Sequence, residues 1–108
     1  MTTRTRADQY IASLRRWASD LATIDEVWDS PTLDERERQA FPVEWDNALD
    51  WLTVVDAMMC AGELSSSELV ALRALARELD SLRPVMERLR LRVPDAALLA
   101  RARGDQAA

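Results

Sequence analysis

Carboxylates at helical spacing are the residues of this 108-residue chain with the clearest potential for chemistry. Asp46 and Asp50 lie four positions apart, Asp25 and Asp29 lie four apart, and Glu26 precedes Asp29 by three. Side chains three or four apart share a helix face, and Mg²⁺ and Mn²⁺ prefer carboxylate oxygen. Two such groups on facing helices could hold a divalent cation, whereas the simpler interpretation leaves all five carboxylates solvated.

Most other catalytic equipment is missing from the sequence. The chain has no histidine, which removes the commonest catalytic base and metal ligand. Cys60, the only cysteine, follows two methionines, and we expect a buried structural thiol. Ser65 lies three positions before Glu68, a spacing typical of a helix cap, and no phosphate-binding loop of glycines and lysine occurs. We therefore expect no catalytic residue and no cofactor.

The four tryptophans all lie in the first half of the chain and are candidates for the core or for an interface. Over 42–61, most apolar residues fall within an arc of about 220° on a helical wheel, which is wider than one neighbouring helix covers. Trp45 or Trp51 could therefore be partly exposed, and tryptophan is frequent among binding hot spots. We expect a partner-binding surface formed by Asp46, Asp50, Trp45, Trp51 and Met58.

Charge is distributed unevenly along the chain. There are 14 basic and 19 acidic residues, a net charge of −5, and every basic residue is arginine. Positions 17–63 carry 12 acidic residues and two arginines, whereas 73–103 carry eight arginines and four acidic residues. One interpretation is that the two halves pack together with each sign on its own solvated face. The others are an acidic surface that meets a basic protein, and self-association of unlike halves.

Several partners and locations are disfavoured by the same features. A net negative charge argues against nucleic acid or an anionic membrane as the main partner. The longest uninterrupted apolar run, 57–61, is far shorter than the ~20 residues that cross a bilayer. Because the first six residues do not resemble a secretory signal, we expect a cytoplasmic protein.

The elements that must position these residues are predicted to be helices. Apolar residues at three- and four-residue steps predict a helix over about 5–29. A capping box at 32–35 would start a short helix over 33–40. Because proline suits the first turn of a helix, Pro42 predicts a break there and a new, central helix over about 42–61.

The second half predicts further helices. A capping box at 65–68 precedes a seam of apolar residues over 72–93 whose spacings alternate between three and four. Pro84 lies inside this seam, so we expect the third long helix to be kinked or broken near it. A final short helix is predicted from Ala96, and the tail at 105–108 should fray.

Together these elements predict an all-α fold, a compact bundle of four to five helices with short loops in one domain over 1–104. The function we expect is a non-enzymatic module that binds another protein, such as an adaptor, an inhibitor or an immunity-type binder. One alternative is a structural homodimer formed through the 72–93 seam or the Trp51–Met58 face. The other is an all-α metal-dependent nucleotide phosphohydrolase that uses the carboxylates of Asp25, Glu26, Asp29, Asp46 and Asp50.

Overall fold

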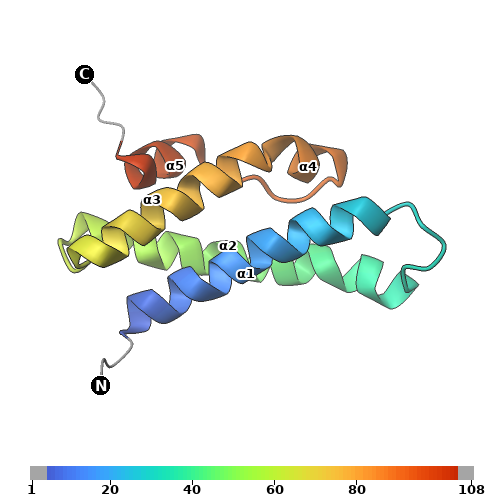
Figure 1. The fold of residues 1–108 in the computed structure, drawn as a ribbon, viewed down its shortest axis with the longest axis horizontal. Helices are drawn as coiled ribbons and strands as arrows, with labels where there is room; N and C mark the ends of the chain where they lie inside the picture. Colours follow the sequence, from blue (N-terminus) through green and yellow to red (C-terminus); the bar gives the residue numbers. More distant parts are fainter. Residues whose placement is uncertain (1–4, 105–108) are drawn as a thin grey trace.

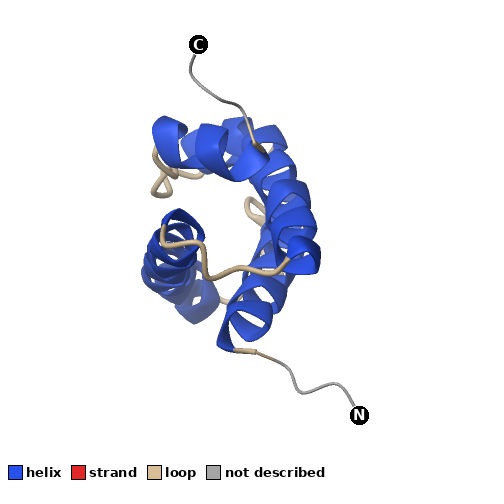
Figure 2. Ribbon diagram, turned by 90° about the vertical axis from the view of Figure 1, so that its left-hand side faces the viewer, coloured by secondary structure: helices blue, strands red, loops and turns tan. Residues whose placement is uncertain are grey.

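The computed structural model describes residues 5–104, which form five helices and no strand (Figures 1 and 2). The predicted all-α bundle is confirmed, while the predicted frayed tail at 105–108 lies outside the described residues. None of these helices combines enough length and apolar character to span a membrane. The helices are α1 (Arg6–Val27), α2 (Glu35–Cys60), α3 (Ser66–Ser81), α4 (Arg83–Arg88) and α5 (Ala96–Arg103).

The helices form a flat arrangement that measures 46 × 40 × 18 Å along its principal axes. α1 and α2 run antiparallel, α3 lies along α1, and α5 lies along α3 (Figure 1). α1 packs against both of the other long helices, α2 and α3, and also touches α4, whereas α2 packs against α1 and α5. The helix predicted over 42–61 lies within α2 and packs against two neighbours, as expected, while α1 contacts three helices.

Side chains from every helix meet in one hydrophobic core, which includes Trp45, Leu52 and Met86 at less than 2% exposure. Full burial of a side chain of this kind contributes about 1.5–3 kcal/mol to stability. The seam predicted over 72–93 forms part of this core, so its side chains are already buried within one chain. These buried side chains are not available to a second copy in this fold, so the homodimer alternative through the seam stays a prediction without an exposed surface. The buried seam residues are Leu72, Leu75, Leu79, Met86 and Leu89.

α2 continues through Pro42, where the sequence predicted a break. Proline has no N–H to donate within the helix and clashes with the preceding turn, so the turns on either side need other support. Phe41 supplies part of it, because it is buried and stacks on Trp45 with ring centroids 6.2 Å apart. Arg38 supplies the rest, since its Nη2 donates to the Trp28 carbonyl at 2.9 Å. These tertiary contacts keep α2 continuous at Pro42, where the sequence pattern predicted two separate helices.

The capping box predicted at 32–35 does not form. α2 begins instead at the N-cap Asp34, whose side chain accepts a hydrogen bond from the Arg36 N–H at 3.0 Å. The Thr32 N–H donates to the Ser30 hydroxyl at 3.2 Å, so Thr32 belongs to the turn between α1 and α2. The short helix predicted over 33–40 is consequently the first part of α2.

Two helix caps meet at Glu68, in the predicted capping box of α3. The Ser65 N–H donates to Glu68 Oε1 at 2.7 Å, and the Ser65 hydroxyl accepts from the Glu68 N–H. The N-cap of α1 is Thr5, whose hydroxyl also donates to Glu68. Glu68 is only 4% exposed, and the hydrogen bond from the Ser65 backbone, followed by that from Thr5, lowers the pKa of its carboxyl. One buried carboxylate therefore joins the starts of α1 and α3.

The predicted break near Pro84 is confirmed, because α3 and α4 are separated at Leu82. Arg90, two residues after the end of α4, adopts the left-handed conformation at φ 58°. The Leu91 N–H then donates to the Met86 carbonyl at 2.8 Å, which completes a Schellman motif. This turn sends the chain back across the bundle toward α2 and α5.

Candidate functional site

The two aspartates predicted to bind a partner lie on the exposed side of α2, beside an arginine of the same chain. Arg92 Nη1 lies 2.8 Å from Asp50 Oδ1 and 3.4 Å from Asp46 Oδ1. It also donates to the Asp46 carbonyl at 3.3 Å. The hydrogen bond to Asp50 is the largest of the effects that raise the pKa of Arg92. This predicted acidic surface is therefore partly neutralised within the chain.

The apolar members of the same predicted surface lie in different environments. Trp45 is 1% exposed and its Nε1 donates to the Arg92 carbonyl at 2.9 Å, so the prediction that it contacts a partner was wrong. Trp51 is 47% exposed and stacks on Tyr10 of α1 with ring centroids 4.6 Å apart. Met58 is half-buried. Of these three apolar side chains, only Trp51 and part of Met58 remain available to a partner.

The alternative metal site is not assembled by the fold. Asp25 forms an ion pair with Arg88, whose Nη1 also lies 3.9 Å from Asp29. Asp46 and Asp50 lie at the separate position beside Arg92. Among residues 5–104, no three acidic or cysteine side chains are grouped so that they could hold a metal ion. The expectation that the five carboxylates converge was therefore wrong.

The arginines of the second half reach across to the acidic first half. Arg88 pairs with Asp25, Arg92 pairs with Asp50, and the third pair joins α5 to α2. In that third pair, Arg101 Nη2 lies 2.8 Å from Asp56 Oδ2, and its hydrogen bond to Asp56 raises the pKa of the guanidinium. The two halves pack together as expected, but opposite charges meet between them instead of occupying separate solvated faces.

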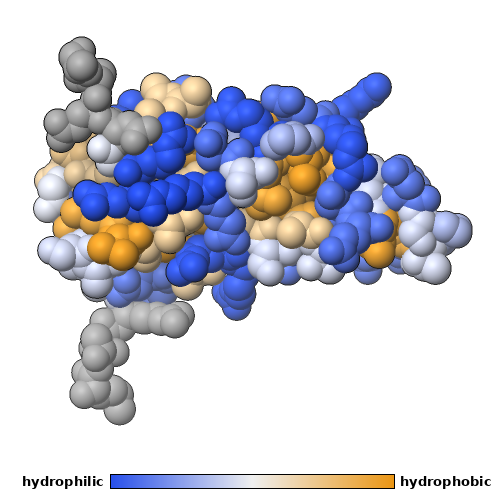
Figure 3. Space-filling view, turned by 45° about the horizontal axis from the view of Figure 1, so that its top comes forward, coloured by the Kyte–Doolittle hydropathy of each residue, from blue (hydrophilic) through white to orange (hydrophobic). Residues whose placement is uncertain are grey.

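Exposed apolar residues are spread over several places. Val43, Trp51 and Val54 follow one side of α2, and Val70 lies on α3. On the face that Figure 3 displays, hydrophobic residues form separate patches divided by hydrophilic ones. Cys60 is exposed at the end of α2, so the prediction of a buried thiol was wrong. Cys60 is the last residue of α2, beyond Val55, which is the last buried residue of that helix.

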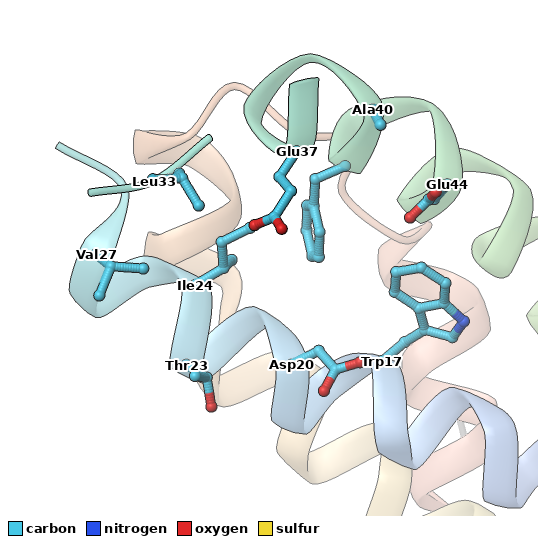
Figure 4. A pocket seen from close by; sticks show the side chains of 10 residues that line it. Trp17, Asp20, Thr23, Ile24, Val27, Leu33, Glu37, Ala40 and Glu44 are labelled. Atoms are coloured by element: carbon cyan, nitrogen blue, oxygen red, sulfur yellow. The ribbon is translucent and has the colours of Figure 1, made fainter. Parts of the chain in front are cut away.

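A groove of about 410 Å³ lies between the second half of α1 and the first half of α2. Its apolar lining includes Trp17 and Ile24 from α1 and Phe41 from α2. Trp17 and Phe41 meet edge to face with ring centroids 5.8 Å apart. Three carboxylates surround this lining, Asp20 from α1 and Glu37 and Glu44 from α2 (Figure 4). We call this feature the acidic groove.

The carboxylates of the acidic groove differ from Asp25, Asp46 and Asp50, which contact arginines of the same chain. Asp20, Glu37 and Glu44 are all exposed. No hydrogen bond or ion pair within residues 5–104 engages their side chains. Arg38, which follows Glu37, is turned away toward the Trp28 carbonyl and Glu35. The groove thus combines an apolar lining with carboxylates for which residues 5–104 supply no hydrogen bond or ion pair.

Sequence reasoning missed this groove because it divided α2 at Pro42. With that break, Glu37 and Glu44 belong to different helices and have no fixed relation. In the continuous α2 they lie seven residues apart on one face, with Phe41 between them. One signal was available in the sequence. Trp17, Asp20 and Ile24 follow one another at steps of three and four residues, which places an acidic residue among apolar ones on one face of α1.

Comparison of the chain with known protein families, with curated proteins and with solved structures gave no match. Its function is therefore inferred from the chemistry of its own surface. On that surface, the acidic groove is the place where shape, apolar lining and negative charge coincide.

Proposed function

We propose that this chain is a small acidic protein-interaction module without catalytic activity, which binds a basic segment of another protein in the acidic groove. We place it in the cytoplasm, where a single exposed thiol such as Cys60 stays reduced. We therefore assign the partner-binding surface to the acidic groove between α1 and α2, and not to the predicted Asp46–Met58 side of α2.

The observation that carries this proposal is that Asp20, Glu37 and Glu44 surround an apolar lining and have no ion-pair partner in the described part of the chain. Elsewhere on the molecule, the carboxylates of Asp25 and Asp50 already have arginines of the same chain. Like charges gathered around a groove repel one another, and a basic occupant would relieve that repulsion. Complementary charge of this kind also speeds association and selects among partners.

Affinity capture from a lysate of the source cells tests the proposal. The bait would be the wild-type chain beside a groove variant that carries Asp20→Asn, Glu37→Gln and Glu44→Gln. A matched control would carry Glu26→Gln, Glu63→Gln and Glu87→Gln, which remove the same charge at exposed positions outside the groove.

We expect a stoichiometric protein with a basic surface that the wild type and the control capture and the groove variant loses. Raising the ionic strength should weaken its capture, because salt screens exposed charges. A partner held equally by all three baits would place the binding surface elsewhere and contradict the proposal.

A homodimer through α2 is a second candidate, favoured by one observation. Val43, Trp51 and Val54 form an apolar stripe along one side of α2 that stays exposed although Trp51 stacks on Tyr10 of α1. Light scattering over a wide concentration range, with wild type and Trp51→Ala, tests it. We expect a dimer that the substitution weakens; the mass of one chain at every concentration would exclude this candidate.

A further inference from the structure

We infer that the occupant of the acidic groove is an amphipathic helix of the partner, with two basic side chains about two turns apart on either side of apolar anchors. This inference rests on the proposed function and specifies the form of the segment that the groove accepts.

The acidic groove lies between two helices, so its lining residues follow helical spacing on both walls. On α1, the lining residues Trp17 and Ile24 are seven positions apart, and Val27 follows Ile24 by three. On α2, Glu37 and Glu44 are seven apart, and an α-helix rises about 1.5 Å per residue. The two glutamates are therefore separated by roughly 10 Å along α2, or about two turns.

A helix laid in this groove presents side chains at the same spacing. Amphipathic helices bind grooves through apolar anchors at positions i, i+3, i+4 and i+7. Basic residues seven positions apart on the occupant would therefore face Glu37 and Glu44, while Asp20 approaches from the opposite wall (Figure 4). The groove volume of about 410 Å³ lies within the range of about 300–1,000 Å³ that is typical of ligand pockets.

A second copy of this chain does not offer that pattern among its described helices. α3 carries Arg73 and Arg77, which are four apart, and α5 carries two arginines two apart. None of the helices of residues 5–104 has two arginines seven positions apart. The apolar faces of α3 and α5 are also buried in the core. These features favour a helix from a different protein.

Binding of synthetic peptides, measured by isothermal titration calorimetry, tests this inference. The probe would be an 18-residue peptide with leucines at i, i+3, i+4 and i+7 and lysines placed seven positions apart beside them. One control peptide has both lysines replaced by glutamine. A second control keeps the lysines and leucines but carries a proline at its centre, which breaks the helix.

We expect the probe to bind the wild-type chain and to gain helicity in circular dichroism as it binds. Glu37→Gln together with Glu44→Gln should weaken binding about tenfold, and either control peptide should bind at least about tenfold more weakly than the probe. The control variant Glu63→Gln should bind the probe like wild type. Melting curves of each variant would show that the fold is retained.

Several outcomes would overturn the inference. Equal binding of the proline-containing peptide would show that the occupant is extended, while the acidic groove would still be a protein-binding site. Absence of probe binding up to millimolar concentration would reject the helical occupant. Concentration-dependent self-association that the groove variant abolishes would instead identify a second copy as the occupant.

Discussion

At the scale of single residues, Glu68 links the starts of two helices through one buried carboxylate. The hydrogen bonds from Ser65 and Thr5 stabilise its ionised form and lower its pKa below the usual 4.5. A carboxyl whose pKa is lower in the folded state adds stability that is fully present above the unfolded pKa. That contribution is lost as the pH falls through the lower folded pKa.

The expected result is a steeper acid destabilisation in the wild type than in Glu68→Gln. Glutamine keeps part of the capping box but does not titrate, so its variant should be less stable near pH 7 by about 1 kcal/mol. The difference between the two proteins should shrink below pH 4.5. Urea unfolding at pH 7, 5 and 3.5 measures it, and Glu63→Gln is the control. A pH-independent difference would contradict the role of the charge.

Arg90 has a backbone conformation that is unfavourable for a residue with a side chain, because its φ of 58° lies in the left-handed region. Glycine adopts this conformation without the clash of a Cβ atom, although it also gains freedom in the unfolded chain. Arg90→Gly should therefore stabilise the protein by up to about 1 kcal/mol. Gly62→Ala, at φ 73°, should destabilise it by a similar amount. Denaturant midpoints of the two variants and the wild type test both effects, which should have opposite signs.

At the scale of elements, α2 depends on tertiary contacts at Pro42. Pro42→Ala supplies the missing N–H to the Arg38 carbonyl and removes the clash of the ring. We expect this substitution to stabilise the protein by about 1–3 kcal/mol in urea unfolding, because proline costs about 3 kcal/mol in a helix interior. A loss of stability would mean that the proline geometry is itself required between Phe41 and Trp45.

The same element shows which parts of the fold are predictable from sequence. Caps that rely on neighbouring residues, such as Ser65 with Glu68, follow local rules and were predicted correctly. Pro42 was interpreted wrongly because Phe41, Trp45 and Arg38 override the local preference through contacts with distant residues. The acidic groove was missed for that same reason, since its spacing exists only in the continuous α2.

At the scale of the whole molecule, ion pairs join the two oppositely charged halves. Arg88, Arg92 and Arg101 contact aspartates of α1 and α2 from the second half of the chain. These pairs are partly exposed, so each contributes little and is screened by salt. The uneven charge was evident in the sequence, but the pairing of particular arginines with particular aspartates required the fold.

Replacing these three arginines by glutamine should lower the melting temperature modestly at low salt. The difference from wild type should become smaller in 1 M NaCl, where the pairs are screened. Differential scanning calorimetry at both salt concentrations measures the effect. Binding at the acidic groove should persist in this variant because none of the three arginines lines it. A difference that grows with salt would contradict the assignment of the effect to charge.

Amide chemical-shift mapping tests most directly whether a basic protein segment binds between α1 and α2. The ¹⁵N-labelled chain would be titrated with the lysine-bearing 18-residue peptide. We expect that the largest shift changes fall within 17–27 and 33–44 and that the groove variant loses them. Changes centred instead on the exposed side of α2 around Trp51 and Met58, unaffected by the groove substitutions, would contradict this expectation.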